Sequence, residues 1–257
     1  MLKMENQALK ETLEILIQQY EYASAYRLVE QQRISGDAKT LLYLMKKRRQ
    51  LAIEELYDPK TVEHFQANYD CQLTVNPQEQ ELLANYIMDL QAKVITEDII
   101  DFVRAVSPIL YRLFLRLIAS QIPDLPNYVK NSKDSSYDTW KFSKMEDSQN
   151  QALQDFASTW HDPRVTSRSL VALTELLPIS ESLKKDVTFL RDMEKSVRNP
   201  LAHLIKPFDE KILHQTTGFS SRSFLEMIIK LARHTGIVYQ ESPFYFDQIN
   251  QLISSLL

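Results

Sequence analysis

The fold class is decided by the stretch Leu9-Lys10-Glu11-Thr12-Leu13-Glu14-Ile15-Leu16-Ile17-Gln18-Gln19-Tyr20. Its apolar residues recur at intervals of three and four, which places them on one face of an α-helix. They are Leu9, Leu13, Leu16, Ile17 and Tyr20. We expect a first long helix over residues 4–34. Gly36 suits the C-terminal cap of this helix, and Asp37 is placed to cap the next one.

A second helical pattern follows the first. It stops at Asp58-Pro59, and its apolar residues are Leu41, Leu42, Leu44, Met45, Leu51 and Leu56. Because only a short turn separates the two patterns, we expect them to form an antiparallel hairpin.

Two further helix starts are marked by capping residues. Asn76-Pro77 combines a capping side chain with a proline suited to a first helical turn, so a helix should run from there to about Gln91. The run Thr96-Glu97-Asp98 starts an amphipathic helix that should reach about Ser120. Pro108 lies inside this helix and predicts a kink.

The helical periodicity fails between residues 122 and 147. Prolines, asparagines and serines accumulate there, with Tyr137, Trp140 and Phe142 among them. Irregular loops of this length are uncommon in compact domains and are often functional, so these aromatic rings are candidates for stacking on bases. The alternative is that they anchor the loop onto the core. Helical patterns return over residues 148–160, 167–176 and 181–197, around residues 224–231, and from about residue 247.

Composition supports an all-helical chain. The 257 residues include only three glycines, whereas a β-sandwich, a Rossmann unit or a P-loop needs glycines at tight turns or phosphate contacts. No strand pattern, repeat or linker is evident. We therefore expect one all-α domain over residues 1–257, a helical bundle with long antiparallel helices and an irregular central loop.

Composition also limits the partners. The single cysteine, Cys71, excludes an intrachain disulfide and a cysteine-rich zinc site. No apolar run reaches the roughly 18 residues of a membrane span, and no signal-peptide core opens the chain, so we expect a cytoplasmic protein with no membrane contact. The formal net charge of −4 argues against a nucleic-acid coat. Any RNA site should be local, and no DNA partner is expected.

The residues that carry chemistry lie in the stretch Ser196-Val197-Arg198-Asn199-Pro200-Leu201-Ala202-His203. Pro200 disfavours helical geometry at the residue before it and suits a first helical turn. We therefore expect one helix to end near Arg198 and a new one, capped by Asn199, to contain His203. In an unbroken helix the two side chains would be about 140° apart around the axis, whereas a break would let Arg198 turn toward His203.

An arginine and a histidine that converge can cleave RNA. A histidine titrates near neutral pH and can move a proton to or from the 2′-hydroxyl or the leaving 5′-oxygen. An arginine holds the phosphate and stabilises its developing charge. Asn199 could orient either partner. The sequence offers no dense carboxylate, histidine or cysteine cluster, so no metal and no other cofactor is expected.

The spacing by itself is weak, because an arginine near a histidine is common. The polar Asn199 directly after Arg198 makes it more specific, and no other histidine of the chain has an arginine at this spacing. The string Arg-Asn-x-x-x-His resembles the R-(polar)-x-x-x-H motif of HEPN domains, which are helical bundles and commonly ribonucleases. The stretch Gln19–Leu28 also resembles the opening helix of the HEPN half of the ancillary ribonucleases of type III-A CRISPR systems.

This resemblance implies a homodimer whose two motifs face each other in one composite cleft. It implies cleavage of single-stranded RNA to a 2′,3′-cyclic phosphate and a 5′-hydroxyl, in CRISPR antiviral defence. Arg198 and His203 would then be catalytic and Asn199 supporting. The CRISPR enzymes also carry a Rossmann-like domain that senses cyclic oligoadenylate. This chain shows no βαβ pattern for one, so such control is not expected.

Several alternatives stay open. Lys195 and Lys206 flank the motif and are candidate phosphate contacts, but charges beside a helix end are often only solvated. His203 could be an ordinary polar residue and Arg198 part of a surface ion pair. The chain could be a toxin ribonuclease neutralised by an antitoxin, or a helical dimerisation module without catalysis.

Overall fold

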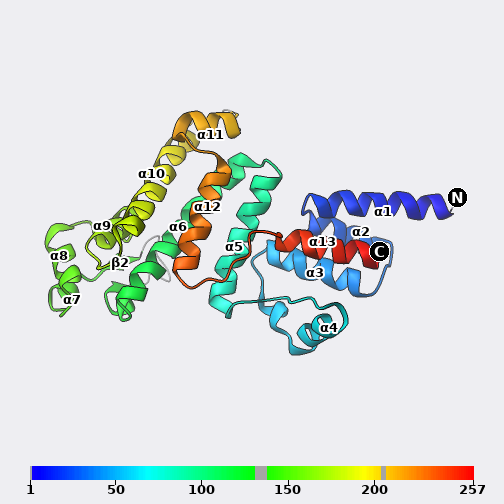
Figure 1. The fold of residues 1–257 in the computed structure, drawn as a ribbon, viewed down its shortest axis with the longest axis horizontal. Helices are drawn as coiled ribbons and strands as arrows, with labels where there is room; N and C mark the ends of the chain where they lie inside the picture. The colour runs from blue at the N-terminus through cyan, green and yellow to red at the C-terminus, as the bar shows by residue number, and fades with distance from the viewer. Residues whose placement is uncertain (1, 131–137, 204–206) are drawn as a thin grey trace. The chain divides into compact units, whose positions relative to one another are not determined.

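The fold is all-α, as the sequence predicts. A computed structural model of the chain describes residues 2–130, 138–203 and 207–257, and the side chains of residues 7–130, 138–197 and 207–257. In these ranges it has thirteen α-helices, two short 3-10 helices and one pair of two-residue strands (Figure 1). The helices form two compact units, Met1–Thr96 with Ile237–Leu257 and Glu97–Gly236.

The first unit is built around α3. Helices α2, α5 and α13 pack against α3, and α1 packs against α2 and α13. The C-terminal helix α13 thus completes a core that the N-terminal helices begin. The elements of this unit are α1 (Leu2–Gln18), α2 (Tyr22–Gln31), α3 (Asp37–Arg49), η1 (Glu54–Tyr57), α4 (Pro59–Tyr69), α5 (Gln78–Ile95) and α13 (Tyr245–Leu256).

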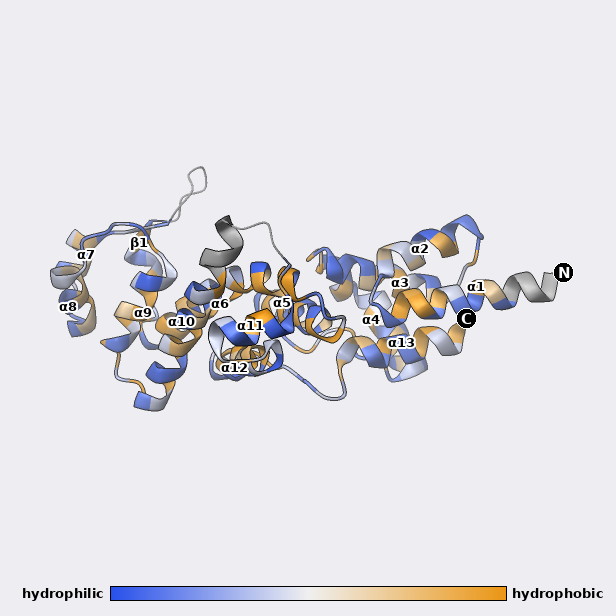
Figure 2. Ribbon diagram, turned by 90° about the horizontal axis from the view of Figure 1, so that it is seen from above, coloured by the Kyte–Doolittle hydropathy of each residue, from blue (hydrophilic) through white to orange (hydrophobic). Residues whose placement is uncertain are grey.

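The second unit is built around α6, which packs against α9, α10 and α12. Hydrophobic and hydrophilic residues alternate along these ribbons, as expected for helices that bury one face (Figure 2). Its elements are α6 (Ile99–Gln121), η2 (Leu125–Asn127), β1 (Val129–Lys130), β2 (Thr139–Trp140), α7 (Phe142–Glu146), α8 (Gln151–Thr159), α9 (Ser167–Glu175), α10 (Glu181–His203), α11 (Glu210–Thr217) and α12 (Ser221–His234).

The predicted first helix over residues 4–34 is wrong, because the chain turns sharply between α1 and α2. Tyr20 has a φ of 57° and its side chain is buried. Its hydroxyl donates to the carboxylate of Asp247 at 2.8 Å, and the amide of Asn250 donates to the carbonyl of Ile17 at 2.8 Å. Both partners lie on α13, so a helix at the far end of the chain stabilises this turn.

The predicted roles of Gly36 and Asp37 are also wrong. Helix α2 ends at Gln31, and Gly36 stands at the N-cap of α3 with a φ of 109°. Asp37 is the first residue of α3, and its carboxylate accepts from the hydroxyl of Tyr69 and pairs with His64 Nε2 at 2.9 Å. These contacts tie α3 to α4, a helix that the sequence patterns did not predict. Part of the expected hairpin is confirmed, because α2 and α3 follow each other in the sequence across a short turn and pack together.

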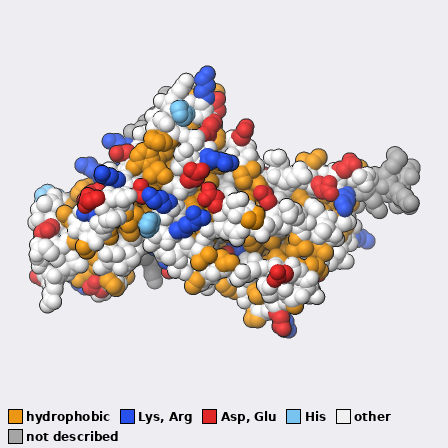
Figure 3. All heavy atoms as spheres, in the orientation of Figure 1, with side chains coloured by type: hydrophobic (Ala, Val, Ile, Leu, Met, Phe, Trp, Pro, Cys, Tyr) orange, Lys and Arg blue, Asp and Glu red, His pale blue; other side chains and the backbone are white. Residues whose placement is uncertain are grey.

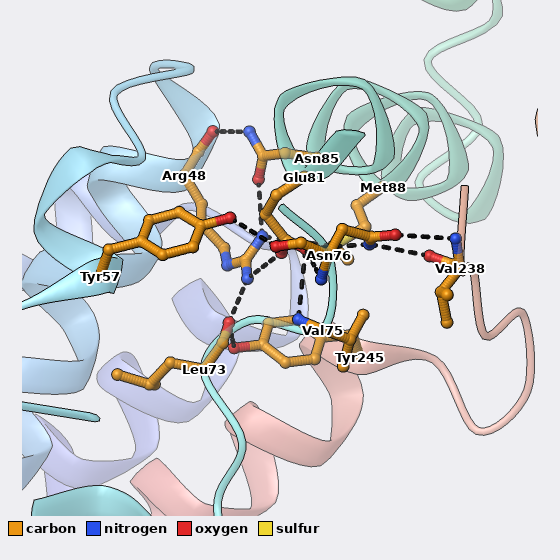
Figure 4. Close-up of polar contacts among 10 residues, drawn as sticks. All are labelled: Arg48, Tyr57, Leu73, Val75, Asn76, Glu81, Asn85, Met88, Val238 and Tyr245. Atoms are coloured by element: carbon orange, nitrogen blue, oxygen red, sulfur yellow. Dashed lines mark hydrogen bonds and ion pairs between the residues drawn. The ribbon is translucent and has the colours of Figure 1, made fainter. Parts of the chain in front are cut away.

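A buried charged cluster holds the first unit together (Figure 4). Arg48 is 1% exposed and forms an ion pair with the fully buried Glu81, at 2.7 Å between Nη2 and Oε1. The same guanidinium donates to Asn85 Oδ1 at 3.2 Å and to the carbonyl of Leu73. Glu81 in turn accepts from the backbone and side-chain amides of Asn76, at 3.1 and 3.0 Å. The cluster therefore joins α3, α5 and the segment between α4 and α5.

The helix starts at Asn76-Pro77 and after Asp98 are confirmed by α5 and α6, and α6 continues through Pro108. Asn76 is not a cap, however, because its side chain bonds Glu81 and the backbone of Val238 instead. None of the described helices is long and apolar enough to cross a membrane.

Candidate active site

The Arg-Asn-x-x-x-His motif occupies the C-terminal end of α10, which runs from Glu181 to His203. The buried residues of this helix recur at helical spacing and face α6, α9, α11 and α12. They are Val187, Leu190, Met193, Glu194 and Val197. The side chains of Arg198, Asn199 and His203 lie outside the described residues, so their convergence stays a prediction.

The predicted helix break at Asn199-Pro200 is wrong, because the backbone of α10 is helical up to His203. A proline inside a helix removes one backbone hydrogen bond, but a helix can continue past it, usually with a kink. Helix α6 passes Pro108 in the same way. The positions of Arg198 and His203 are therefore about 140° apart around the axis of one helix.

A buried carboxylate lies one helical turn before Arg198. Glu194 is 3% exposed, and its Oε2 lies 3.4 Å from Nη1 of Arg191. Its Oε1 receives a long contact from the hydroxyl of Ser167 on α9, at 3.5 Å. Within the described part of the chain, Glu194 Oε2 and Arg191 Nε are buried and have no hydrogen-bond partner. The Glu194 side chain is therefore buried next to α9, directly before the motif.

Of the two lysines that flank the motif, only Lys195 lies within the described residues. Lys195 is exposed, and no described side chain forms an ion pair with it. This leaves it able to contact a phosphate, which remains a prediction. Lys206 lies outside the described residues. Lysine, arginine and histidine side chains on the visible face of α10 and α12 are interspersed with carboxylates (Figure 3).

The chain is anchored again soon after the motif. Phe208 is buried, and Asp209 caps α11 by accepting from the amide of Ile212 at 2.9 Å. Glu210 Oε1 accepts from the amide of Ser221, the first residue of α12, at 2.8 Å. The motif thus ends α10 and is followed by the packed helix α11, which was not predicted from the sequence.

Among the aromatic residues of the predicted central loop, Trp140 has a structural role. Trp140 is 4% exposed, its Nε1 donates to Ser169 Oγ at 3.1 Å, and its ring contacts Phe156 edge-to-face with 5.2 Å between centroids. Trp140 therefore anchors this segment to α8 and α9, as the alternative interpretation of the loop predicts. Tyr137 lies outside the described residues. The segment is also less irregular than expected, because β1 pairs with β2 and α7 follows.

Side chains that could bind a metal are not grouped in the described part of the chain. No group of three or more histidine, cysteine, aspartate or glutamate residues in them is arranged to hold a metal ion. Burial raises the pKa of the Cys71 thiol, which keeps it protonated and unreactive.

The fold resembles that of solved structures. Csm6 of Enterococcus italicus, in a complex described as bound to cyclic hexa-2′-fluoro-hexa-dAMP, matches with a TM-score of 0.72 and 15% sequence identity. The match covers 100% of this chain and 59% of that protein, so this chain spans about three fifths of its length. At this identity the match establishes the fold alone. A comparison with curated proteins gave no match.

The sequence itself matches one family model, described as the Cas_Csm6 HEPN domain, over residues 70–254. The matched region contains the whole Arg198–His203 motif and includes parts of both compact units. The expected single domain over residues 1–257 therefore stays a prediction, whereas the expected HEPN relationship is confirmed. The chain belongs to the Cas_Csm6 HEPN domain family.

Proposed function

We propose that this chain is a metal-independent endoribonuclease that cuts single-stranded RNA in type III CRISPR antiviral defence. The observation that carries the proposal is the Arg198-Asn199-x-x-x-His203 string at the end of α10, inside the region that matches the family. The family match also favours a CRISPR role over a toxin–antitoxin pair. No cofactor is proposed.

The proposed reaction uses the 2′-hydroxyl of the RNA as nucleophile. His203 takes the proton of this hydroxyl, and its oxygen attacks the adjacent phosphorus. The bond between phosphorus and the 5′-oxygen breaks, and the 5′-oxygen receives a proton from the second histidine of the dimer. Arg198 stabilises the charge on the phosphate, and Asn199 orients these groups. The products are a 2′,3′-cyclic phosphate and a 5′-hydroxyl.

A homodimer would overcome the separation of the two positions on α10. Because the backbone of α10 is continuous, positions 198 and 203 of one chain lie about 140° apart around the helix axis. Two such helices that meet around a symmetry axis would present both residue types to one phosphate from opposite sides. The composite site is therefore part of the proposal. The exposed Lys195 is proposed to contact flanking phosphates.

Binding of the cyclic nucleotide that the Enterococcus italicus complex contains is not proposed for this chain. Only 59% of that protein is covered by the match, and the present sequence shows no pattern for a Rossmann-like sensor. Cytoplasmic location is part of the proposal, since its substrate would be intracellular RNA.

The test is a ribonuclease assay in the presence of EDTA. We expect the wild-type chain to cut a labelled single-stranded RNA, and Arg198→Ala and His203→Ala each to slow cutting by at least about 1,000-fold. Circular dichroism should show unchanged helix content in both variants. Mass spectrometry of the products should find cyclic phosphate ends. Equal cutting by wild type and both variants would overturn the proposal.

The continuous helix α10 favours one second candidate, a helical dimerisation module without catalysis. In such a module positions 198 and 203 can stay apart on the helix, because no phosphate has to be held between Arg198 and His203. This candidate predicts a stable dimer that leaves RNA intact at every protein concentration, with or without added metal ions.

A further inference from the structure

The outer face of the α2–α3 hairpin gathers positive charge around two aromatic rings. We call the residues Tyr26, Arg27, Lys39, Tyr43, Lys46 and Lys47 the α2–α3 face. All six side chains are half-buried or exposed. On α3, positions 39, 43, 46 and 47 follow one another at helical spacing and therefore share one side of the helix.

The rings and ammonium groups of this face are in direct contact. The centroids of Tyr26 and Tyr43 lie 5.5 Å apart, with an angle of 50° between the ring planes. Lys46 Nζ lies 4.8 Å and Lys39 Nζ 5.7 Å from the centroid of Tyr26, and Lys47 Nζ lies 5.3 Å from that of Tyr43. Two ammonium groups thus converge on a single ring.

Most neighbouring cations are neutralised, but these two are not. In the last turn of α3, Lys47 pairs with Glu55 at 3.3 Å, and Arg48 and Arg49 form ion pairs with carboxylates of α5. Among the described side chains, Lys39 and Lys46 have no ion-pair partner.

Arg27 likewise lacks an ion pair among the described side chains. The nearby carboxylates of Glu30 and Glu55 accept from the hydroxyls of Tyr26 and Tyr43, at 2.9 and 2.8 Å. The face therefore has four cations and two carboxylates.

This excess is local, because the whole chain has a formal net charge of −4. Ammonium groups held around one ring repel each other, and a polyanion that binds between them would relieve this repulsion. Tyrosine rings beside lysines are a combination with which proteins bind single-stranded nucleic acids, with phosphates on the cations and bases stacked on the rings. A single phosphate ion would explain the lysines but not the paired rings.

We propose that the α2–α3 face binds single-stranded RNA and is an RNA contact separate from the Arg198–His203 motif. Lys39 and Lys46 bind phosphates, and a base stacks on Tyr26. This inference rests on the proposed function for the identity of the ligand. It assigns a substrate-retaining role to the first unit, which contains none of the motif residues.

The test measures RNA binding by the full chain under conditions that prevent cutting. Every protein carries His203→Ala, and the probe is a fluorescein-labelled oligouridylate whose anisotropy is recorded at several salt concentrations. Adding Lys39→Gln with Lys46→Gln should weaken binding about tenfold. It should also make the plot of log affinity against log salt concentration shallower, by about 1.4 in slope for the loss of two phosphate contacts to a single strand. Tyr26→Leu should also weaken binding, whereas Tyr26→Phe should retain it.

The matched control removes the same charge elsewhere. Lys60 on α4 and Lys211 on α11 are exposed, so Lys60→Gln with Lys211→Gln lowers the net charge equally without touching the face. We expect this control to change the affinity less than about twofold. Equal effects of the two double variants, or no effect of either, would overturn the inference. A lysine pair that changed only self-association in sedimentation would assign the face to a protein partner and overturn it as well.

Failure of this inference is distinguishable from failure of the proposed function. If wild type cuts RNA but the lysine pair leaves affinity unchanged, only the α2–α3 face is wrong. If no cutting occurs while the lysine pair still weakens RNA binding, the binding face stands without the ribonuclease.

Discussion

Arg48 shows what a buried charge needs in this protein. Its guanidinium donates to Glu81, to Asn85 and to the carbonyl of Leu73. The guanidinium carbon also lies over the ring of Tyr245, 4.6 Å from the ring centroid. Burial raises the pKa of the Tyr245 hydroxyl to about 12, so the tyrosine stays neutral beside the ion pair at physiological pH. The arginine therefore has one formal counter-charge, Glu81, and several neutral acceptors.

Removing one partner of this pair should destabilise the chain strongly. Arg48→Met leaves the Glu81 carboxylate buried and uncompensated, which should lower the free energy of unfolding by about 3–5 kcal/mol. Urea unfolding followed by circular dichroism would measure it. Arg49→Met is the control, because Arg49 is 25% exposed in its ion pair with Asp89 and its loss should cost less than about 1 kcal/mol. Equal losses in the two variants would contradict the assignment of Arg48.

At the scale of elements, local signals placed most helices correctly, but they joined two helices that distant contacts separate. Periodicity predicts α5, α6, α9 and α12 because each buries a regular apolar stripe. It joins α1 and α2 into one helix because the apolar spacing continues through Tyr20. The turn there is stabilised by Asp247 and Asn250, which no local pattern could identify.

The same limit applies to the candidate site. The residue types and spacing of Arg198, Asn199 and His203 predict a HEPN domain, and the match to the Cas_Csm6 HEPN family model confirms this prediction. Pro200 predicts a helix restart, yet the backbone of α10 is helical up to His203, so one lost backbone hydrogen bond does not end this helix. The buried Glu194 was missed, since a glutamate near a helix end usually reads as a solvated charge.

The link between α3 and α4 should respond to pH through Asp37. The hydroxyl of Tyr69, and secondarily His64, hold the pKa of the Asp37 carboxyl below its ordinary value. A depressed carboxyl pKa stabilises the fold at pH above the unfolded value of about 3.9, and this contribution disappears as the pH falls through the folded value. Tyr69→Phe should raise the pKa of Asp37 toward the ordinary value, as seen by NMR titration of its carboxyl carbon.

Tyr57→Phe is the matched control for this titration. The Tyr57 hydroxyl donates to the backbone of Asn76 at 2.8 Å and makes no contact with Asp37, so its removal should leave the Asp37 titration in place. A Tyr69→Phe variant that titrates like wild type would show that another group depresses this pKa.

At the scale of the whole molecule, the decisive property is whether two chains build one site. If each phosphate is held by residues of both chains, a dimer of one wild-type and one His203→Ala subunit should be inactive. Mixing wild type with a tenfold excess of His203→Ala and allowing subunits to exchange should then reduce cutting to about a tenth of its initial rate, the fraction of wild-type chains that still pair with each other.

The outcome depends on subunit exchange, which sedimentation of differently labelled chains would verify before the assay. An excess of Arg198→Ala should inhibit wild-type cutting in the same way, because this variant also contributes an incomplete half of the composite site. Dilution offers an independent reading: the cutting rate per chain should fall in step with the dimer fraction measured in the same samples. If excess His203→Ala leaves the wild-type rate unchanged while subunits exchange, each chain holds a complete site, and Arg198 and His203 must converge on a single α10.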